Sequence, residues 1–455
     1  MVTQEIRERI LNFNEISLGY TPVMANLEAQ RCLGCKDPKC MLGCPINIDI
    51  PGFIKYIKDN DFRNALIHLK EYNFFPSICG RVCPQEIHCE KLCILGKNGK
   101  SIAIGALERF VGDWEKENLV IANPTLVPSN YLKVAIIGSG PAGLACATKL
   151  AKKGYNTTIF EALHAGGGVL MYGIPEFRLP KKIVEDEINT LKNLNIEIKY
   201  NCVIGKTLTI DDLRDMGFKA FFIVIGAGLP IILNIPGTNL NGVLTANEFL
   251  TRVNLMKAYK FPEYDTPIKI GKIVVVIGGG NSALDSARVA LRLGAQKVII
   301  VYRRSKVEMP ARKEEYQHAI EEGIKFQFLT NPIRIIGDES ESVKEMEVIK
   351  MRLCEPDQSG RRRPIPIKNS EYLIKADTII LAIGTHANSI LLKTIPELKL
   401  NKDGYIETDE FGRTNIEDVF AGGDITTGTA TVISAIVAGY KTAKVIDKFL
   451  KTKFN

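Results

Sequence analysis

The chain has 455 residues, of which 45% are hydrophobic and 24% are charged, and its formal net charge is +8. One hydrophobic core rarely supports such a length, so the sequence predicts about three domains. No apolar run is long enough to cross a membrane, and the N-terminus MVTQEIRERILNFNE lacks the apolar core of a secretory signal. We expect a cytoplasmic protein that binds neither membranes nor nucleic acid, because basic residues are mostly interspersed with acidic ones.

Cysteine is concentrated near the N-terminus, in a segment whose remaining pattern predicts helices. Dense cysteine in a chain of this length without a secretory signal indicates metal rather than a disulfide scaffold. The spacing is C-x2-C-x4-C-x3-C-P in the first group and C-x3-C-P-x4-C-x3-C in the second. The first group comprises Cys32, Cys35, Cys40 and Cys44, and the second comprises Cys79, Cys83, Cys89 and Cys93.

The C-x3-C-P spacing is typical of iron–sulfur proteins, in which the fourth cysteine often ligates the other cluster. Eight cysteines match the eight ligands that two [4Fe-4S] clusters need. A zinc ribbon usually has two C-x-x-C knuckles, and only Cys32 and Cys35 have that spacing, so zinc is the less favoured alternative. His88 is expected to be a neighbour of the cluster rather than a ligand.

The linker ANPTLVPSN separates this segment from a second half of different character. From Tyr131 onward, short β-rich runs alternate with glycine turns and helices, which is typical of a doubly wound α/β fold. The stretch YLKVAIIGSGPAGLACATKLAKKGYNTTIFEA resembles a later one, KIVVVIGGGNSALDSARVALRLGAQKVIIVYRR. Two dinucleotide sites on one chain explain this internal similarity.

The first glycine turn follows the strand KVAII and opens a helix. The first glycine permits the tight turn, the second lets a pyrophosphate approach the backbone, and the third lets the helix pack on the strand. Glu161 ends the next strand, where an acid can accept hydrogen bonds from ribose hydroxyls. The candidate residues of the turn are Gly138, Gly140, Pro141, Ala142 and Gly143.

The second glycine turn has Ala283 in the third glycine position, which the fingerprint tolerates. Its next strand ends in Arg303 and Arg304 rather than in an acid, and arginine can form charge-assisted hydrogen bonds with a 2′-phosphate. This predicts NADPH rather than NADH. The candidate residues of the turn are Gly278, Gly280, Asn281 and Ser282.

The C-terminal stretch VFAGGDITTGTATVISAIVAGYKTA contains a strand, a Gly-Gly-Asp turn and an apolar helix. Asp424 can reach the ribityl or phosphate hydroxyl groups of a flavin, and Gly423 and Thr431 are further candidates. Paired with the first glycine turn, this segment predicts a FAD domain built from two separated segments. FAD is expected at the first turn and NADPH at the second.

These segments predict an α/β protein in which a helical N-terminal iron–sulfur domain precedes two Rossmann-like dinucleotide-binding domains. The expected boundaries are 1–120 for the iron–sulfur domain, 131–250 and 377–455 for the two FAD segments, and 251–376 for the inserted NADPH domain.

Along nearly its whole length the chain resembles the family of NADPH-dependent glutamate synthase small (beta) subunits. The family includes the large subunit of NADH-dependent ferredoxin:NADP oxidoreductase and the N-terminal half of dihydropyrimidine dehydrogenase. The stretches that carry the resemblance include RCLGCKDPKCMLGCPINIDIPGFI, GRVCPQEIHCEKLC, IGALERFVGDW and GGGVLMYGIPEFRLPK. The resemblance implies that Gly167, Gly168 and Arg178 line the flavin, although alone they indicate only a glycine-rich loop with a basic end.

The resemblance also implies how the ligands divide between the clusters. One cluster would take Cys32, Cys35, Cys40 and Cys93. The other would take Cys44, Cys83, Cys89 and a non-cysteine ligand that falls on Glu108. Spacing alone favours Cys79 for that fourth position, and Glu108 could instead pair with Arg109 or Arg81.

These cofactors predict hydride transfer from NADPH to FAD and then one-electron transfer into the clusters. The chemistry belongs to the cofactors, so no catalytic side chain is predicted. The resemblance implies a second redox subunit. Val2 supplies no N-terminal cysteine nucleophile for glutamine hydrolysis, so the chain is not expected to make glutamate by itself. We favour the glutamate synthase large chain as the partner, because that name covers the wider set of relatives. The alternative is an electron-bifurcating transhydrogenase, with a ferredoxin-reductase-like flavoprotein as partner and ferredoxin as acceptor.

Two further features bear on these alternatives. A self-contained disulfide reductase is disfavoured, because no C-x-x-C pair follows Cys93. The basic run 361–363 is either a charged hairpin tip or a contact to a partner or to ferredoxin, and the first interpretation is favoured.

Overall fold

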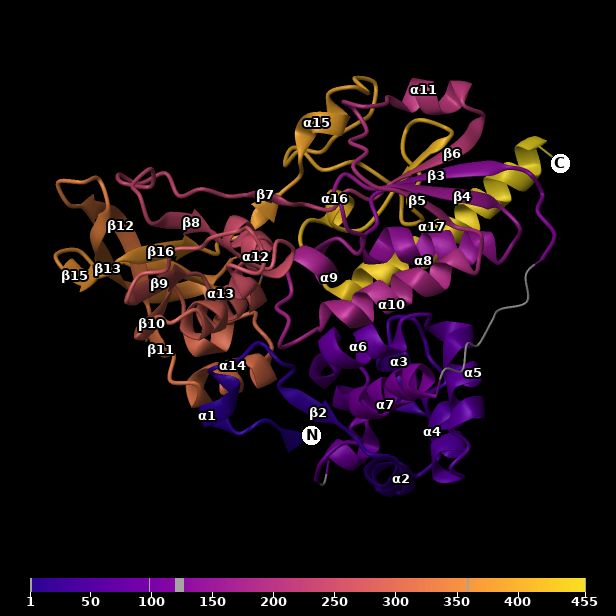
Figure 1. The fold of residues 1–455 in the computed structure, drawn as a ribbon, viewed down its shortest axis with the longest axis horizontal. Coiled ribbons are helices and arrows are strands. Elements are labelled where there is room, and N and C mark those ends of the chain that lie inside the picture. Colours follow the sequence, from indigo (N-terminus) through magenta and orange to yellow (C-terminus); the bar gives the residue numbers. More distant parts are fainter. Residues whose placement is uncertain (1, 98, 119–126, 358–359, 455) are drawn as a thin grey trace.

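The structure, a computed structural model, describes residues 2–97, 99–118, 127–357 and 360–454 (Figure 1). Part of the expected linker (122–126) and part of the basic loop (358–359) therefore lie outside the described residues. A helical region lies below two parallel sheets in the view of Figure 1. In the described part of the chain, no helix has both the length and the apolar character needed to span a bilayer.

The N-terminal helical domain is a bundle of short helices. Asp49 and Asp61 cap two of them, because their carboxylates accept hydrogen bonds from the amides of Gly52 and Asn64 at 3.1 Å. Apolar residues at helical spacing, such as Ile50, are buried in the shared core. The helices are α2 (Pro22–Gln30), α3 (Lys39–Gly43), α4 (Ile50–Lys58), α5 (Phe62–Tyr72), α6 (Pro76–Val82) and α7 (Ile104–Glu117), with 3-10 turns at Gln85–Ile87, Glu90–Leu92 and Ile94–Lys97.

The Rossmann-like domain that contains the first glycine turn and the C-terminal segment is here called the outer domain. It has a parallel five-stranded sheet in the order β18-β6-β3-β4-β5. Successive residues of β3 pack on opposite faces, so helices cover both sides of the sheet. Its strands are β3 (Lys133–Ile137), β4 (Asn156–Phe160), β5 (Glu197–Lys199), β6 (Phe218–Ile223) and β18 (Val419–Ala421). Its helices are α8 (Pro141–Ala151), α9 (Val169–Tyr172), α10 (Lys181–Lys192), α11 (Ile210–Asp215), α15 (Ser389–Leu392), α16 (Asp424–Thr427) and α17 (Val432–Phe454).

The inserted domain has a second parallel sheet in the order β11-β10-β9-β16-β8. Helices cover one face, and an antiparallel sheet covers the other. The parallel strands are β8 (Val243–Thr245), β9 (Ile273–Ile277), β10 (Lys297–Tyr302), β11 (Lys325–Phe328) and β16 (Thr378–Leu381). The antiparallel strands are β12 (Thr330–Gly337), β13 (Val343–Pro356), β14 (Arg362–Pro366) and β15 (Tyr372–Lys375). The helices are α12 (Ala246–Asn254), α13 (Asn281–Arg292) and α14 (Lys313–Glu321), with 3-10 turns at Ala258–Lys260 and Lys306–Glu308.

The expected insertion of one Rossmann-like domain into the other is confirmed, but its boundaries differ from those expected. Both β8, before residue 250, and β16, after residue 376, belong to the inserted sheet. The chain crosses between the domains at a two-stranded ribbon, β7 (Leu229–Pro230) with β17 (Thr385–His386). Strands of three or four residues carry too little pattern to be assigned to one sheet from sequence, because their hydrogen-bond partners are distant in the chain.

The expected unit 1–120 also needs a correction, because its first residues form an arm that leaves the helical domain. The arm contains β1 (Val2–Thr3), α1 (Ile6–Arg9) and β2 (Ser17–Gly19). Arg9 is only 1% exposed, and its guanidinium pairs with Glu321 at 2.8 Å and with Glu322 at 3.1 Å in the inserted domain. A charged segment such as RERI normally indicates a solvated face, so the sequence around Arg9 does not predict that this side chain is buried.

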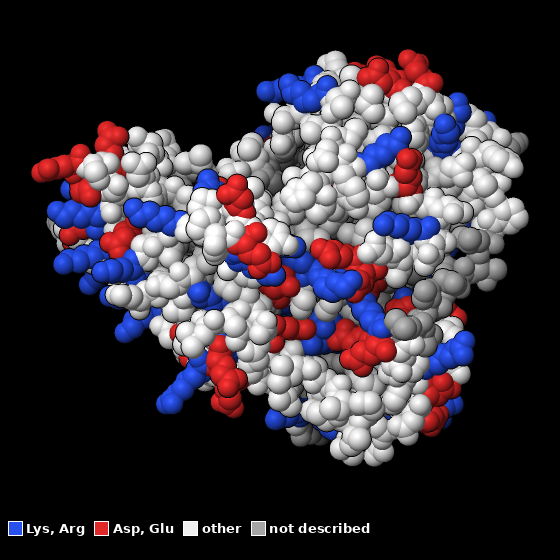
Figure 2. All heavy atoms as spheres, viewed as in Figure 1, with Lys and Arg blue, Asp and Glu red and all other residues white. Residues whose placement is uncertain are grey.

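Surface charge of both signs is mixed across the face shown in Figure 2. Red and blue atoms gather where the outer, inserted and helical domains meet. This agrees with the expectation from sequence that basic residues are interspersed with acidic ones.

The packing of α17 on α8 joins the C-terminal segment to the first glycine turn. Gly439 of α17 is buried, and a Cβ atom there would lie 2.3 Å from the carbonyl oxygen of Ala142 and 3.0 Å from the Cβ of Ala145. Only glycine therefore lets the two helices approach this closely.

We expect Gly439→Ala to destabilise the protein by about 1–3 kcal/mol, because the added methyl group overpacks the contact with α8. In an ordinary helix interior the same change would stabilise by about 1 kcal/mol, so the sign distinguishes the two cases. The measurement is urea unfolding followed by circular dichroism. Lys441→Ala, at an exposed position of the same helix, is the control and should change stability by less than about 0.5 kcal/mol. A stabilised Gly439→Ala variant would contradict the packing argument.

Candidate cofactor-binding sites

The first glycine turn has the geometry that the three glycine positions predict. Gly138 has φ +111°, and a Cβ atom there would lie 2.5 Å from the carbonyl oxygen of Val224. A Cβ atom on Gly143 would lie 2.1 Å from the carbonyl oxygen of Gly138, so helix and strand touch at this point. A Cβ atom on Gly140 would meet no other atom within 4 Å, which leaves the helix N-terminus open to a phosphate group.

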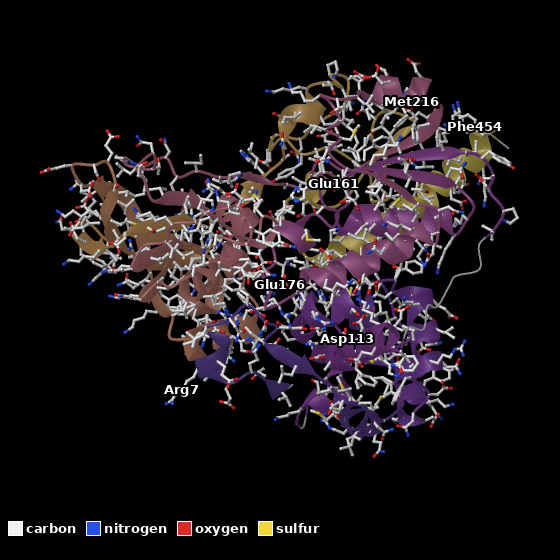
Figure 3. All side chains as sticks on the ribbon, in the orientation of Figure 1. Arg7, Asp113, Glu161, Glu176, Met216 and Phe454 are labelled. Atoms are coloured by element: carbon white, nitrogen blue, oxygen red, sulfur yellow. The ribbon has the colours of Figure 1, made fainter. Side chains whose placement is uncertain are left out.

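Glu161 lies on the side of the outer sheet that faces the inserted domain (Figure 3). Its carboxylate accepts hydrogen bonds from the amide of Ser139 at 3.0 Å and from the amide of Leu163 at 2.8 Å. These bonds fix the carboxylate beside the turn, and its remaining lone pairs can accept ribose hydroxyls. That role for Glu161 stays a prediction.

The loop with Gly167 and Gly168 lies directly over this turn. The amide of Gly167 donates to the Ser139 hydroxyl at 3.0 Å, and a Cβ atom on Gly168 would lie 2.9 Å from the Cα of Gly140. The structure therefore brings together two segments that sequence reasoning assigned to the flavin.

The C-terminal Gly-Gly-Asp turn meets the same place. Gly423 has φ +72°, and a Cβ atom there would lie 3.4 Å from the Cβ of Ala142. The carboxylate of Asp424 accepts a hydrogen bond from the amide of Ala430 at 3.2 Å, and burial raises its pKa. Thr431 caps α17, since its hydroxyl accepts from the amide of Ser434 at 3.2 Å. The Gly-Gly-Asp turn thus lies beside the first glycine turn, and the roles of Asp424 and Thr431 at a flavin stay predictions.

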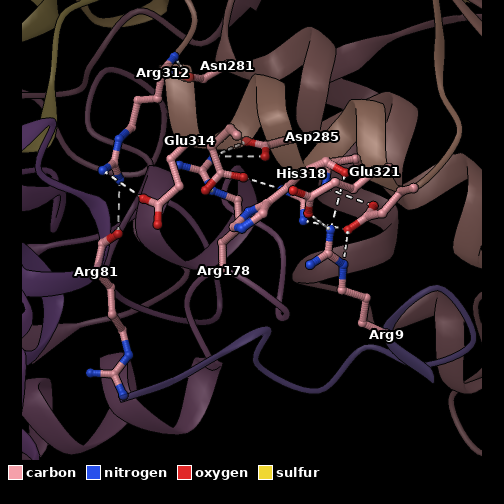
Figure 4. Close-up of polar contacts among 12 residues, drawn as sticks. Arg9, Arg81, Arg178, Asn281, Asp285, Arg312, Glu314, His318 and Glu321 are labelled. Atoms are coloured by element: carbon pink, nitrogen blue, oxygen red, sulfur yellow. Dashed lines mark hydrogen bonds and ion pairs between the residues drawn. The ribbon is translucent and has the colours of Figure 1, made fainter. Parts of the chain in front are cut away.

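Arg178 occupies a different place from the one that the resemblance implied. Its side chain is 8% exposed, and its guanidinium donates to the two carboxylate oxygens of Asp285 at 2.8 and 2.7 Å and faces Glu315 at 3.1 Å (Figure 4). Asp285 and Glu315 belong to the inserted domain. We therefore assign Arg178 to the interface between the outer and inserted domains rather than to the flavin.

The second glycine turn repeats the geometry of the first. Gly278 has φ +148°, and a Cβ atom there would lie 2.2 Å from the carbonyl oxygen of Ala382. Gly280 again has open space around it, and Asn281 and Ser282, which begin α13, are exposed. The turn can therefore receive a second pyrophosphate.

Only one of the two arginines expected at the 2′-phosphate is exposed. Arg304 is buried and donates to Asp357 at 2.5 Å and to the carbonyl oxygen of Arg362 at 2.8 Å, which ties it to the β13–β14 hairpin. Arg303 is exposed, and its pKa is lowered by partial burial and by the cations of Arg304 and Arg361. An exposed arginine with neighbouring cations suits a phosphate, so binding of the 2′-phosphate by Arg303, with Arg304 in support, stays a prediction.

Cysteines from both sequence groups, here called the buried cysteine group, line an apolar cavity of about 20 Å³ between the helical and outer domains. The donors that line it are Cys44, Cys79, Cys83, Cys89 and Glu108. Burial raises the pKa of the Cys83 and Cys89 thiols, so iron must displace their protons on binding. The donor chemistry of this lining, thiols beside apolar side chains, suits an iron–sulfur cluster.

Among the described residues, no ion pair joins Glu108 to Arg81 or Arg109, which was the alternative to ligation. Arg81 and Arg109 pair instead with Glu15 and Asp113. The carboxylate of Glu108 accepts from the Nδ2 of Asn73 at 2.6 Å, and burial raises its pKa to about 8. Sequence reasoning missed Asn73, although a polar residue in the apolar run before the second cysteine group was a usable signal.

The other four cysteines lie nearer the surface. Cys32, Cys35, Cys40 and Cys93 are all partly exposed. The pKa of Cys40 is raised to about 11 by burial and by the neighbouring Cys32 and Cys93 thiols, which shows that three of the four lie together. In the described part of the chain, no group of three or more His, Cys, Asp or Glu side chains is arranged as a site for a single metal ion.

Family models match both halves of the chain. Residues 132–440 match the family described as pyridine nucleotide-disulphide oxidoreductase, and residues 9–120 match dihydropyrimidine dehydrogenase domain II with its 4Fe-4S cluster. The chain belongs to the pyridine nucleotide-disulphide oxidoreductase family. As a member of this family with an added 4Fe-4S domain, it is an NADP-dependent FAD and iron–sulfur oxidoreductase.

Curated relatives of this family member carry several names. It is 37% identical, over 90% of its length, to the NADP(+)-dependent formate dehydrogenase subunit beta of Moorella thermoacetica, of which it spans 60%. It is 36% identical, over 99% of its length, to the NADPH-Fe(3+) oxidoreductase subunit beta of Geobacter sulfurreducens, of which it spans 69%. It is 32% identical, over 98% of its length, to the glutamate synthase [NADPH] small chain of Halomonas elongata, of which it spans 94%. The resemblance to the glutamate synthase small-chain family is thus confirmed.

The fold also resembles a solved structure of Mycobacterium tuberculosis FprA in complex with NADPH. The TM-score is 0.60 at 22% sequence identity, and the match covers 71% of this chain and 85% of FprA. This likeness confirms the expected α/β fold.

The fourth ligand of the buried cluster can be identified by substitution. We expect Glu108→Ala to lose the iron and the paramagnetic signal of that cluster, because the variant removes an oxygen ligand. Cys79→Ser, the matched variant from the same cavity, should keep both clusters. Iron analysis and electron paramagnetic resonance (EPR) of dithionite-reduced protein check this, and the reverse pattern would assign the position to Cys79.

The nucleotide preference depends on Arg303. Because a charge-assisted hydrogen bond contributes about 1.5–3 kcal/mol, we expect Arg303→Gln to weaken NADPH binding about 10- to 100-fold and to leave NADH binding unchanged. Anaerobic stopped-flow measurement of flavin reduction gives both affinities. Arg334→Gln, at an exposed ion pair of the same domain, is the control. Equal losses for NADPH and NADH would refute the role of Arg303.

Proposed function

We propose that the chain is the electron-input subunit of a larger enzyme, the small chain of an NADPH-dependent glutamate synthase. The observation that carries the proposal is the arrangement of sites within one chain. One chain holds two glycine turns, a buried cavity lined by cysteines and a second cysteine group nearer the surface. The match to glutamate synthase small chains over 94% of their length supports this choice.

The residues of the chain bind and orient the cofactors. In this proposal Gly140, Gly168 and Asp424 hold the FAD, and Gly280 and Arg303 hold the NADPH. Together the bound cofactors supply hydride transfer from nicotinamide to flavin and one-electron transfer through two [4Fe-4S] clusters. The protein fixes their spacing and keeps water from the hydride.

The order of the clusters follows from the packing of α17. Ile433, two residues after Thr431, lines the cavity of the buried cysteine group. The helix that begins beside the FAD site therefore also contacts this cavity. We infer that the buried cluster receives electrons first and the partly exposed cluster second.

Exposed side chains next to the partly exposed cysteines in sequence, here called the rim, are suited to a protein partner. Exposed apolar side chains flank its cysteines in sequence: Leu33, Leu42, Leu92 and Ile94. Exposed lysines accompany them: Lys36, Lys39, Lys91, Lys97 and Lys100. Asp37 pairs with Lys39 at 2.5 Å. We infer that the partner is a redox subunit that presents acidic side chains around an apolar centre.

The identity of the partner can be tested by purifying the chain from its source without oxygen and identifying co-purifying chains by mass spectrometry. A large amidotransferase-type chain, with glutamine- and 2-oxoglutarate-dependent oxidation of NADPH, supports the proposal. A ferredoxin-reductase-like flavoprotein would replace it by the electron-bifurcating transhydrogenase. A formate dehydrogenase catalytic chain would favour the second candidate suggested by the 37% identity to that beta subunit.

The docking rim gives a separate prediction. We expect the double variant Lys36→Glu/Lys91→Glu to weaken binding of the co-purified partner about 10-fold at low salt, because like charges now meet at the rim. Biolayer interferometry measures the affinity, and the rate of flavin reduction by NADPH should not change. Lys206→Glu, at an exposed position of the outer domain, is the control. An unchanged affinity would show that the partner binds elsewhere.

A further inference from the structure

Arg312 connects the second glycine turn with the iron–sulfur domain. It precedes α14, and only 8% of the residue is exposed. Its backbone amide donates to the side-chain oxygen of Asn281 at 2.9 Å, and Asn281 is the first residue of α13 at the turn (Figure 4). Because the side-chain oxygen of Asn281 accepts this bond, the Nδ2 group of Asn281 remains available to donate to a bound nucleotide.

The guanidinium of Arg312 crosses the domain interface. It donates to both carboxylate oxygens of Glu86 at 3.1 Å, to the carbonyl oxygen of Arg81 at 3.2 Å and to the side-chain oxygen of Gln85 at 3.3 Å. Glu314, on its own helix, lies at 3.2 Å. Four of its five acceptor atoms therefore belong to the helical domain, and only arginine has a donor fork that can satisfy them together.

These acceptors flank Cys83, a ligand of the buried cluster. Gln85 also donates to the carbonyl oxygens of Cys79 at 3.0 Å and of Gly80 at 3.3 Å. Gln85, which accepts a hydrogen bond from Arg312, also lines the cavity of the buried cysteine group. Arg312 thus holds the backbone around the buried cluster and places a positive charge near it.

We propose that Arg312 is a positioning residue that raises the reduction potential of the buried cluster and couples that potential to nucleotide binding at the second glycine turn. The inference rests on the proposed electron path and adds a means of controlling it. A cation in a low-dielectric site stabilises the reduced cluster, which carries one more negative charge. Because Arg312 also fixes Asn281, nucleotide binding and cluster reduction become linked, and each changes the other by the same factor.

The charges around Arg312 determine in which direction each substitution shifts the reduction potential of the buried cluster. Glu86 and Glu314 offset part of its charge, and Glu90, Glu315 and Lys313 line the same interdomain cavity of about 340 Å³. Arg312→Gln removes the cation and leaves these acids, so reduction of the cluster becomes less favourable. Glu86→Gln leaves the cation less compensated, so reduction becomes more favourable.

The experiment is a redox titration of the anaerobic FAD- and cluster-loaded protein, monitored by EPR. It is run with and without 2′-phospho-ADP-ribose, which carries the pyrophosphate but no nicotinamide. In Arg312→Gln we expect the ratio of reduced to oxidised buried cluster at a fixed potential to fall about 10-fold, which corresponds to about 59 mV for one electron. The exposed cluster should be unchanged, and the shift caused by the nucleotide analogue should disappear.

Three further variants make the test decisive. Glu86→Gln is expected to shift the potential in the opposite direction, and it carries the test if Arg312→Gln fails to retain its clusters. Arg312→Lys keeps the positive charge, so it should shift the reduction potential of the buried cluster much less than Arg312→Gln does. Arg334→Gln is the matched control for loss of an arginine in the inserted domain. An unchanged potential in both Arg312→Gln and Glu86→Gln, or a nucleotide shift that persists in Arg312→Gln, would overturn the inference. Reduction of the FAD and clusters by NADPH in the unsubstituted protein tests the proposed function separately.

Discussion

The arrangement of the three domains depends on buried carboxylates of the inserted domain that pair with arginines from distant parts of the chain. Glu315 faces Arg178 of the outer domain and Arg288 of its own domain. Glu322 faces Arg9 of the N-terminal arm. Removing charges from water is unfavourable unless each charge is paired with good geometry, so other domain orientations would leave several charges uncompensated. The network therefore specifies the domain orientation more than it adds to stability.

That orientation determines which sites can exchange electrons. With Arg178 held at the interface, the second glycine turn is fixed relative to the first, and Arg312 connects the second turn to the loop of Cys83. The packing of α17 on α8 then keeps the first glycine turn beside the cavity of the buried cysteine group. Each cofactor site is local in sequence, whereas the path between the sites depends on contacts between domains.

The sequence could predict the features that are local in the chain, but it could not predict the contacts between domains. The glycine turns were predictable because each glycine answers a local backbone requirement, as the close contact between Gly143 and Gly138 shows. The cysteine groups were predictable from spacing. The burial of Arg9, the interface role of Arg178 and the hairpin contacts of Arg304 were not, because each depends on acceptors that are distant in sequence. The strand β8 was assigned to the wrong domain for the same reason, since its hydrogen-bond partner, β16, is distant in the chain.

The rim of exposed leucines and lysines around the outermost cysteines has an evolutionary consequence. It lies on a different domain from both nucleotide turns, so its side chains can change without disturbing hydride chemistry. The chain converts electron pairs into single electrons. Surface substitutions alone can therefore adapt it to a new electron acceptor during evolution. If the same module has been combined with different partners, its relatives should carry different names. The relatives named for formate dehydrogenase, for Fe(3+) reduction and for glutamate synthase agree with this expectation.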